Sequence, residues 1–294
     1  MPNNVRHCDI ALYADDTCIF TPSKDPREIE RKLNEDLLSL SNWLNDNKLM
    51  VNSKKCEVLF IGTHQRLKKA HDLLDDCHIY IDGNEIKKVE SCKYLGVIID
   101  QNLSWNTQVD YVKKKVIKSM YLLKRLRPYI NQITALLFYK SVIQCQFDYC
   151  STVWTNASKS YLSQLQTLQN RSLRIVMSVD YMFPSNRLYE ALQLDRLDVR
   201  WAKLLACTMY RSVHKLCPPY LSNIFCFRES IYNTRSGPCK LKLTQPKTNY
   251  GRRSFTYRGA KLWNVLERSV STIASIESFK RHLNGNPNIL NFNL

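Results

Sequence analysis

Short alternating runs of apolar and polar residues occupy the first hundred positions, a pattern typical of β-strands separated by turns. Two runs, at 9–13 and 18–20, flank the tetrapeptide Tyr-Ala-Asp-Asp at positions 13–16 and predict a β-hairpin. A helix over 26–47 follows, because Asp25 can cap it, Pro26 suits its first position, and leucines recur at helical spacing. Further strands are predicted at 56–61 and 94–99, with a second hairpin turning at 82–84.

After Trp105 the apolar period lengthens to that of helices. A stripe formed by Val109, Val112, Val116 and Met120 predicts a long helix that ends near Pro128, with this stripe in the core. More helices are predicted at 133–147, 162–176, 188–194, 197–216 and 275–283. The chain is therefore of the α+β class, with strands and one helix first and helices afterwards.

Charge separates the same two regions. Over the whole chain 43 Lys and Arg face 26 Asp and Glu, a net charge of +17. Residues 1–105 hold 14 basic and 17 acidic side chains, whereas 106–294 hold 29 and 9. So uneven a distribution favours a polyanionic partner for the second region.

The segment 234–261 has eight basic residues and no acid. Aromatic side chains at Tyr250, Phe255, Tyr257 and Trp263 lie among or beside these cations, and they could stack on unpaired bases. The alternative is a solvated basic face whose aromatics belong to the core.

Composition excludes some classes of protein. No apolar run is long enough to span a bilayer, and the polar start is not a signal peptide. The eleven cysteines include no C-x-x-C pair, so buried or incidental thiols in a reducing compartment, nuclear or cytoplasmic, are favoured over a zinc site.

Only the Asp15-Asp16 pair has catalytic character. A tight turn can bring both carboxylates to one edge, where they suit a hard cation such as Mg²⁺. Two such ions can clamp the attacking and leaving oxygens of a nucleotidyl transfer. Taken alone, an Asp-Asp pair is also common in turns that bind no metal, and this is the alternative interpretation.

The order of motifs decides between these alternatives. Strand, Tyr-Ala-Asp-Asp, strand and capped helix are followed by Asn-Ser-Lys-Lys-Cys-Glu at 52–57 and Tyr-Leu-Gly-Val at 94–97. This order resembles the C-terminal part of a reverse transcriptase from a non-LTR retrotransposon of the jockey-like kind. Segments at 187–192, 234–236 and 251–255 resemble the region that follows the polymerase in such elements.

The resemblance implies roles for single residues. Asp15 and Asp16 would hold Mg²⁺, and Lys55, with Lys54 beside it, would neutralise or protonate the pyrophosphate leaving group. Tyr13, Tyr94 and Gly96 would lie near the primer or nucleotide. A solvated loop pair remains the alternative for the two lysines, and a core position for Tyr13. Cys56 stands where the family usually has Thr.

The resemblance also divides the chain into the end of a palm at 1–104, a helical thumb at 105–180 and a basic helical region at 181–294. The implied partners are an RNA template and a DNA primer, or another nucleic acid, and the oligomeric state stays open. The cations expected to contact phosphates are Lys113, Lys114, Lys118, Lys124, Arg125, Arg235, Lys240, Lys242, Arg252, Arg253 and Arg258.

One further metal-binding Asp of the family lies on a strand well upstream of the turn, beyond the fingers. Twelve residues precede Tyr13, and Asp9 lies on the hairpin itself. Half of a two-metal site is therefore expected, and negligible polymerase activity for this polypeptide alone. The alternatives are a non-catalytic RNA- or DNA-binding protein, decayed or domesticated, and an inactive relic.

Overall fold

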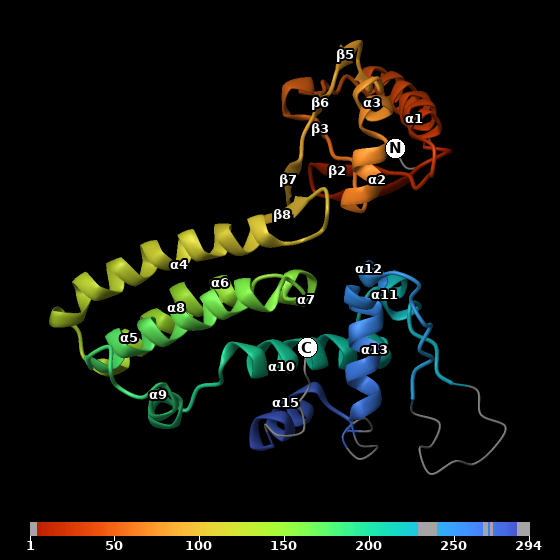
Figure 1. Cartoon of the computed structure of the whole chain (residues 1–294). Coiled ribbons are helices and arrows are strands. Elements are labelled where there is room, and N and C mark those ends of the chain that lie inside the picture. Colours follow the sequence, from red (N-terminus) through yellow and green to blue (C-terminus); the bar gives the residue numbers. More distant parts are fainter. Residues whose placement is uncertain (1–4, 229–239, 267–269, 271–272, 287–294) are drawn as a thin grey trace. The chain divides into compact units, whose positions relative to one another are not determined.

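In a computed structural model, residues 5–228, 240–266, 270 and 273–286 are described. They fall into two units, Met1–Thr107 and Gln108–Leu294. Strands and helices are mixed in the first unit, and helices make up nearly all of the second (Figure 1). This combination agrees with the α+β class expected from the sequence.

The first unit opens with the predicted hairpin, β1 (Asp9–Tyr13) and β2 (Asp16–Phe20), paired antiparallel. Its remaining strands form three further two-stranded pairings, of which β3 with β6 is parallel and the others are antiparallel. The elements that follow the hairpin are α1 (Pro26–Asp46), η2 (Ser53–Lys55), β3 (Glu57–Val58), α2 (His64–Lys69), α3 (His71–Asp75), β4 (Tyr80–Ile81), β5 (Asn84–Glu85), β6 (Lys87–Lys88), β7 (Ser91–Tyr94) and β8 (Val97–Asp100).

Helix α1 holds this unit together. It begins where predicted, because the Asp25 side chain accepts a hydrogen bond from the backbone N–H of Arg27. Its Asn34 accepts from the backbone N–H of Tyr80 at 2.9 Å and donates to the His78 carbonyl at 2.8 Å. These bonds tie the helix to β4, and Leu37 packs with Ile79, Ile81 and Ile86 in one core.

A buried carboxylate on α1 fixes the approach to the hairpin. Asp36 is 2% exposed and accepts backbone N–H bonds from Arg6, His7 and Cys8 at 2.8–2.9 Å. Burial acts to raise the pKa of Asp36, but these hydrogen bonds outweigh it, so the pKa lies below its ordinary value of 3.8. The ionised form is therefore the one that stabilises the fold.

We expect Asp36→Asn to lower the free energy of unfolding at neutral pH by about 2–3 kcal/mol, because an amide cannot accept all three N–H bonds. A lowered pKa contributes stability that is complete above the ordinary value and is lost as pH falls through the folded value. In urea titrations the difference from the unsubstituted chain should stay constant down to about pH 4 and then shrink. Asp46→Asn, at the exposed end of α1, is the control and should change stability by less than about 0.5 kcal/mol.

The structure corrects the predictions for two strands. Residues 94–99 are not one strand, because Leu95 and Gly96 have φ of 45° and 79° and form the turn of a hairpin between β7 and β8. Positive φ at both central residues suits the right-handed twist of a hairpin, and glycine adopts it without strain. The strand expected at 56–61 is reduced to β3, and the polar stretch after it forms α2 and α3.

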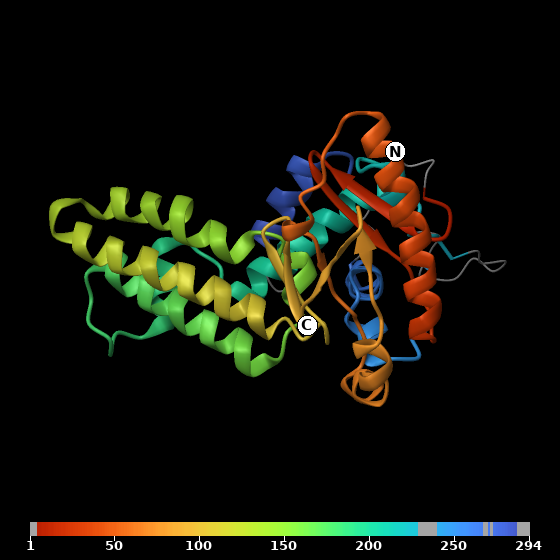
Figure 2. The ribbon, with the colours of Figure 1, turned by 90° about the horizontal axis from the view of Figure 1, so that it is seen from above.

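The second unit confirms the long basic helix and most of the later helices. Val109, Val112, Val116 and Leu123 of α4 are buried, as the apolar stripe predicted, whereas Met120 of the same stripe is half-buried. Figures 1 and 2 show α4, α5 and α8 running alongside one another. The elements are α4 (Asn106–Leu126), η3 (Arg127–Tyr129), α5 (Gln132–Phe138), the π-helix η4 (Tyr139–Gln144), α6 (Cys145–Asp148), α7 (Ser151–Trp154), α8 (Lys159–Met177), α9 (Ser185–Leu192), α10 (Leu197–Val213), α11 (Pro219–Ser222), α12 (Asn249–Arg253), α13 (Phe255–Val265) and α15 (Ile276–Gly285).

Helices α10, α13 and α15 enclose the core of the C-terminal part. Trp263 is 2% exposed there, so the prediction that it stacks on bases is wrong and the core alternative is right. Gly259 allows α13 to approach α10, since a Cβ at this position would lie 2.3 Å from the Met209 sulfur. Phe255 packs against the same core and lies 5.7 Å from Phe225, ring to ring. Core packing thus explains part of the aromatic content of this basic segment.

Candidate functional site

The Tyr-Ala-Asp-Asp segment forms the tip of the β1–β2 hairpin. Tyr13 pairs with Asp16 across the strands, and Ala14 and Asp15 form the turn between them. Ala14 adopts φ of 53°, the left-handed conformation that a two-residue hairpin turn requires. Both carboxylates are exposed, and Tyr13 is 65% exposed, so the core alternative for this tyrosine is wrong.

The hairpin is held at its base by the core of the first unit. Ile19 of β2 packs against the cluster formed with Leu37 of α1, and Val51, Cys56 and Val58 pack on the same cluster. The turn and the Asn-Ser-Lys-Lys-Cys-Glu segment, although 36 residues apart in the sequence, are therefore parts of one structural unit.

Tyr94 is the predicted residue that the structure relates directly to the acidic turn. Burial raises the pKa of the Tyr94 hydroxyl, and the charges of Cys18 and Asp16 act in the same direction. Gly96 belongs to the turn that directly follows Tyr94.

The two adjacent exposed carboxylates could supply part of the ligand shell of a divalent cation. Mg²⁺ takes one or two carboxylates and completes its shell with water and substrate phosphates, which matches the number present at this turn. Among the described residues no group of three or more His, Cys, Asp or Glu is arranged to hold a metal. Asp9 lies at the far end of β1, paired with Phe20, about 13 Å from Tyr13 by the rise of a strand.

Lys54 and Lys55 lie on the 3₁₀ turn η2 and are exposed. The turn is closed by backbone bonds from Lys55 N–H to the Asn52 carbonyl and from Cys56 N–H to the Ser53 carbonyl. Cys56 also donates from Sγ to the Asn52 carbonyl at 3.5 Å, so it fills the position where the family usually has Thr. The role of Lys55 toward a leaving group stays a prediction.

Comparison with known proteins now shows what the chain is similar to. Residues 1–99 match the family described as "Reverse transcriptase (RNA-dependent DNA polymerase)". This first third of the chain is therefore similar to reverse transcriptases. The jockey-like resemblance predicted from the motifs is thereby confirmed, because the similar curated proteins are RNA-directed DNA polymerases of non-LTR elements.

Two of these relatives come from Drosophila melanogaster. The chain is 22% identical over 189 residues to the "Probable RNA-directed DNA polymerase from transposon X-element", and 23% identical over 192 residues to the "RNA-directed DNA polymerase from mobile element jockey". The matches cover 63% and 64% of this chain but 20% of each relative, so the chain spans about a fifth of their length. They extend past the reverse transcriptase segment into the second unit. No solved structure gives a significant match.

The predicted phosphate-binding cations have varied surroundings in the structure. Lys114, Lys118, Lys124 and Arg125 are exposed on α4, whereas Lys113 donates from Nζ to Gln164 Oε1 at 2.7 Å. In the C-terminal part Lys242, Arg252 and Arg253 are exposed, Lys240 and Arg258 are half-buried, and Arg235 lies outside the described residues. No helix in the described part of the chain is long and apolar enough to cross a membrane.

Sequence reasoning missed the basic side chains of α8. Arg171 and Arg174 of this helix line a groove together with Lys124 of α4, which lies about fifty positions earlier in the chain. A search for apolar periodicity along α8 detects only its buried face. Arg171 and Arg174 are three positions apart, and this helical spacing was the signal that could have found them.

Proposed function

We propose that the first unit contributes the metal-binding turn of a non-LTR retrotransposon reverse transcriptase, and that the second unit binds template and primer. The observation that carries this proposal is the pair of exposed carboxylates at the tip of a hairpin, within the segment that matches the family. The reaction would be nucleotidyl transfer to a primer 3′-OH, templated by RNA.

In this proposal Asp15 and Asp16 hold the divalent cation, because both are exposed and neighbours on one turn. A bound Mg²⁺ would stabilise the charge that develops on the transferring phosphoryl group. Tyr13, exposed beside the acids, contacts the primer terminus or the nucleotide. Lys55 offers a cation to the leaving pyrophosphate.

The second unit has the charge that phosphate binding needs. Lys114, Lys118, Lys124 and Arg125 lie exposed along α4, while the apolar stripe of the same helix is buried. Lys and Arg contacts to phosphates give affinity without sequence readout. We assign these side chains to the backbone of the template–primer.

A second candidate function is a binding protein without catalysis. Residues after Trp105 include 29 basic and 9 acidic side chains, which favours this function. Such positive charge can bind nucleic-acid phosphates without a metal site. The two candidates differ in whether the acidic turn matters for function.

Primer extension on a primed RNA template with Mg²⁺ tests the catalytic claim. We expect the purified 294-residue polypeptide to bind the template without extending it, because the described residues place no third metal-binding side chain beside the acidic turn and catalytic carboxylates act as a unit. If the unsubstituted chain extends the primer and Asp15→Asn abolishes this extension, the metal-binding role of the turn is confirmed and the expected inactivity is wrong. Extension that survives Asp15→Asn would contradict the assignment of the turn.

A further inference from the structure

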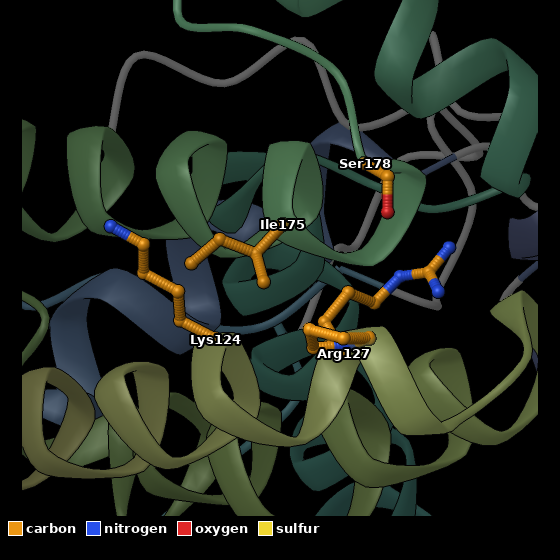
Figure 3. A pocket seen from close by; sticks show the side chains of 5 residues that line it. Lys124, Arg127, Ile175 and Ser178 are labelled. Atoms are coloured by element: carbon orange, nitrogen blue, oxygen red, sulfur yellow. The ribbon is translucent and has the colours of Figure 1, made fainter.

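Helices α4 and α8 enclose a groove on the surface of the second unit, with a volume of about 760 Å³. A smaller pocket of about 380 Å³ adjoins it, since Lys124 and Ile175 line both. Figure 3 shows this smaller pocket, with Lys124 on α4 and Arg127 at the start of η3 facing Ile175 on α8 and Ser178 directly after that helix. The larger groove is lined by Met120, Tyr121, Lys124, Thr167, Asn170, Arg171, Arg174, Ile175, Val179 and Tyr181.

Hydrogen bonds fix the walls of this groove. Arg127 donates from Nε to the Val176 carbonyl at 3.0 Å and from a terminal nitrogen to the Ile130 carbonyl at 2.8 Å, so it joins the ends of α4 and α8. Arg174 donates twice to the Phe183 carbonyl, which holds the segment after α8 against the helix. Ser178, with φ of 54°, ends α8 and turns the chain toward Tyr181. These hydrogen bonds preorganise the groove for a ligand.

The charge of the groove is positive. Lys124, Arg171 and Arg174 line it, and neither Asp nor Glu does. The carboxylate nearest along the chain, Asp180, accepts backbone N–H bonds from Met182 and Phe183, so it serves the loop that follows α8. The groove therefore attracts an anion with several charges rather than a neutral ligand.

Two tyrosines flank these cations. Tyr121 of α4 is 61% exposed and Tyr181, after α8, is 81% exposed. Aromatic faces left open beside Lys and Arg are the combination that binds unpaired bases, because the rings stack on bases while the cations contact phosphates. A duplex keeps its base faces stacked internally and would use the cations alone.

We propose that the groove formed by α4 and α8 binds single-stranded RNA, with Lys124 and Arg171 on phosphates and Tyr121 and Tyr181 stacked on bases. The proposal deepens the nucleic-acid-binding role proposed above for the second unit, and rests on it. RNA is chosen because the relatives are named RNA-directed polymerases. A span of unpaired template next to the duplex would occupy this groove.

Fluorescence titration of the full chain with a labelled twelve-nucleotide oligouridine tests the proposal. The variants are Lys124→Ala/Arg171→Ala and Tyr181→Ala, with Tyr181→Phe to keep the ring. Matched controls are Lys140→Ala/Lys159→Ala, which removes two exposed charges outside the groove, and Tyr129→Ala, which removes a tyrosine that is 85% exposed elsewhere. Circular dichroism melts check that each variant is folded.

We expect the groove charge variant to weaken binding at least tenfold and to reduce the slope of log affinity against log salt by about 1.4, since each single-strand phosphate contact contributes about 0.7. Tyr181→Ala should lose about tenfold and Tyr181→Phe almost nothing. The controls should stay within about threefold of the unsubstituted chain.

Equal losses in groove and control variants would overturn the groove while leaving the nucleic-acid-binding role of the unit intact. An unsubstituted chain that binds no RNA at low salt would overturn both. Equal affinity for an RNA hairpin duplex, with the same loss on Tyr181→Ala, would contradict the single-strand assignment. Tighter binding of DNA of the same sequence would contradict the choice of RNA.

Discussion

Raising monovalent salt from 50 to 200 mM should weaken the binding of a primed RNA template to the full chain about a thousandfold. The physical reason is counterion release, because each phosphate neutralised by Lys or Arg frees a condensed cation, and six or more contacts give a loss of this size. The second unit offers that number of contacts, since α4, α8 and α12 all carry exposed basic side chains.

Filter binding at a series of salt concentrations measures this slope. Asp15→Asn is the control, because it leaves every cation of the second unit in place and should not reduce the slope or the affinity. Affinity that is flat with salt would contradict phosphate binding by this unit. A strong loss of affinity in Asp15→Asn at every salt concentration would show that the acidic turn, and not the basic helices, dominates binding.

Local signals account for the part of the fold that the sequence predicted well. The hairpin at 9–20, the capped start of α1 at Pro26 and the buried stripe of α4 each depend on residues within one or two turns of the chain. Short-range periodicity and capping contain this information directly. The acidic pair of the candidate site was found the same way, because its two members are adjacent.

Features set by distant residues were predicted poorly. The segment at 94–99 is a short apolar run like that of a strand, yet Leu95 and Gly96 turn it into a hairpin, and the sequence offered only one glycine as a sign. Trp263 lies among cations in the sequence but is buried, because α10 and α15 pack against its helix. Such packing follows from tertiary contacts, which periodicity along one segment does not contain.

The groove between α4 and α8 shows the same limit for function. Tyr121 and Tyr181 lie sixty positions apart, and each is an ordinary surface residue when the sequence is considered alone. Their common site becomes visible when the two helices are placed side by side. The motif-based prediction identified the cations on α4 but not their partners on α8.

Divalent-cation binding at the hairpin tests the central claim, that Asp15 and Asp16 form the metal-binding turn. Mn²⁺, a paramagnetic substitute for Mg²⁺, would be titrated into the full chain labelled with ¹⁵N, and amide signals would be followed by NMR. Asp9→Asn serves as the control, since it removes an acid from the same hairpin but from the opposite end of β1. The double variant Asp15→Asn/Asp16→Asn removes the proposed ligands.

The account predicts selective broadening of the signals around residues 13–17 in the unsubstituted chain and in Asp9→Asn, and its complete loss in the double variant, because neutral amides bind hard cations much more weakly than carboxylates do. Broadening that persists in Asp15→Asn/Asp16→Asn, or that centres away from the turn in the unsubstituted chain, would contradict it.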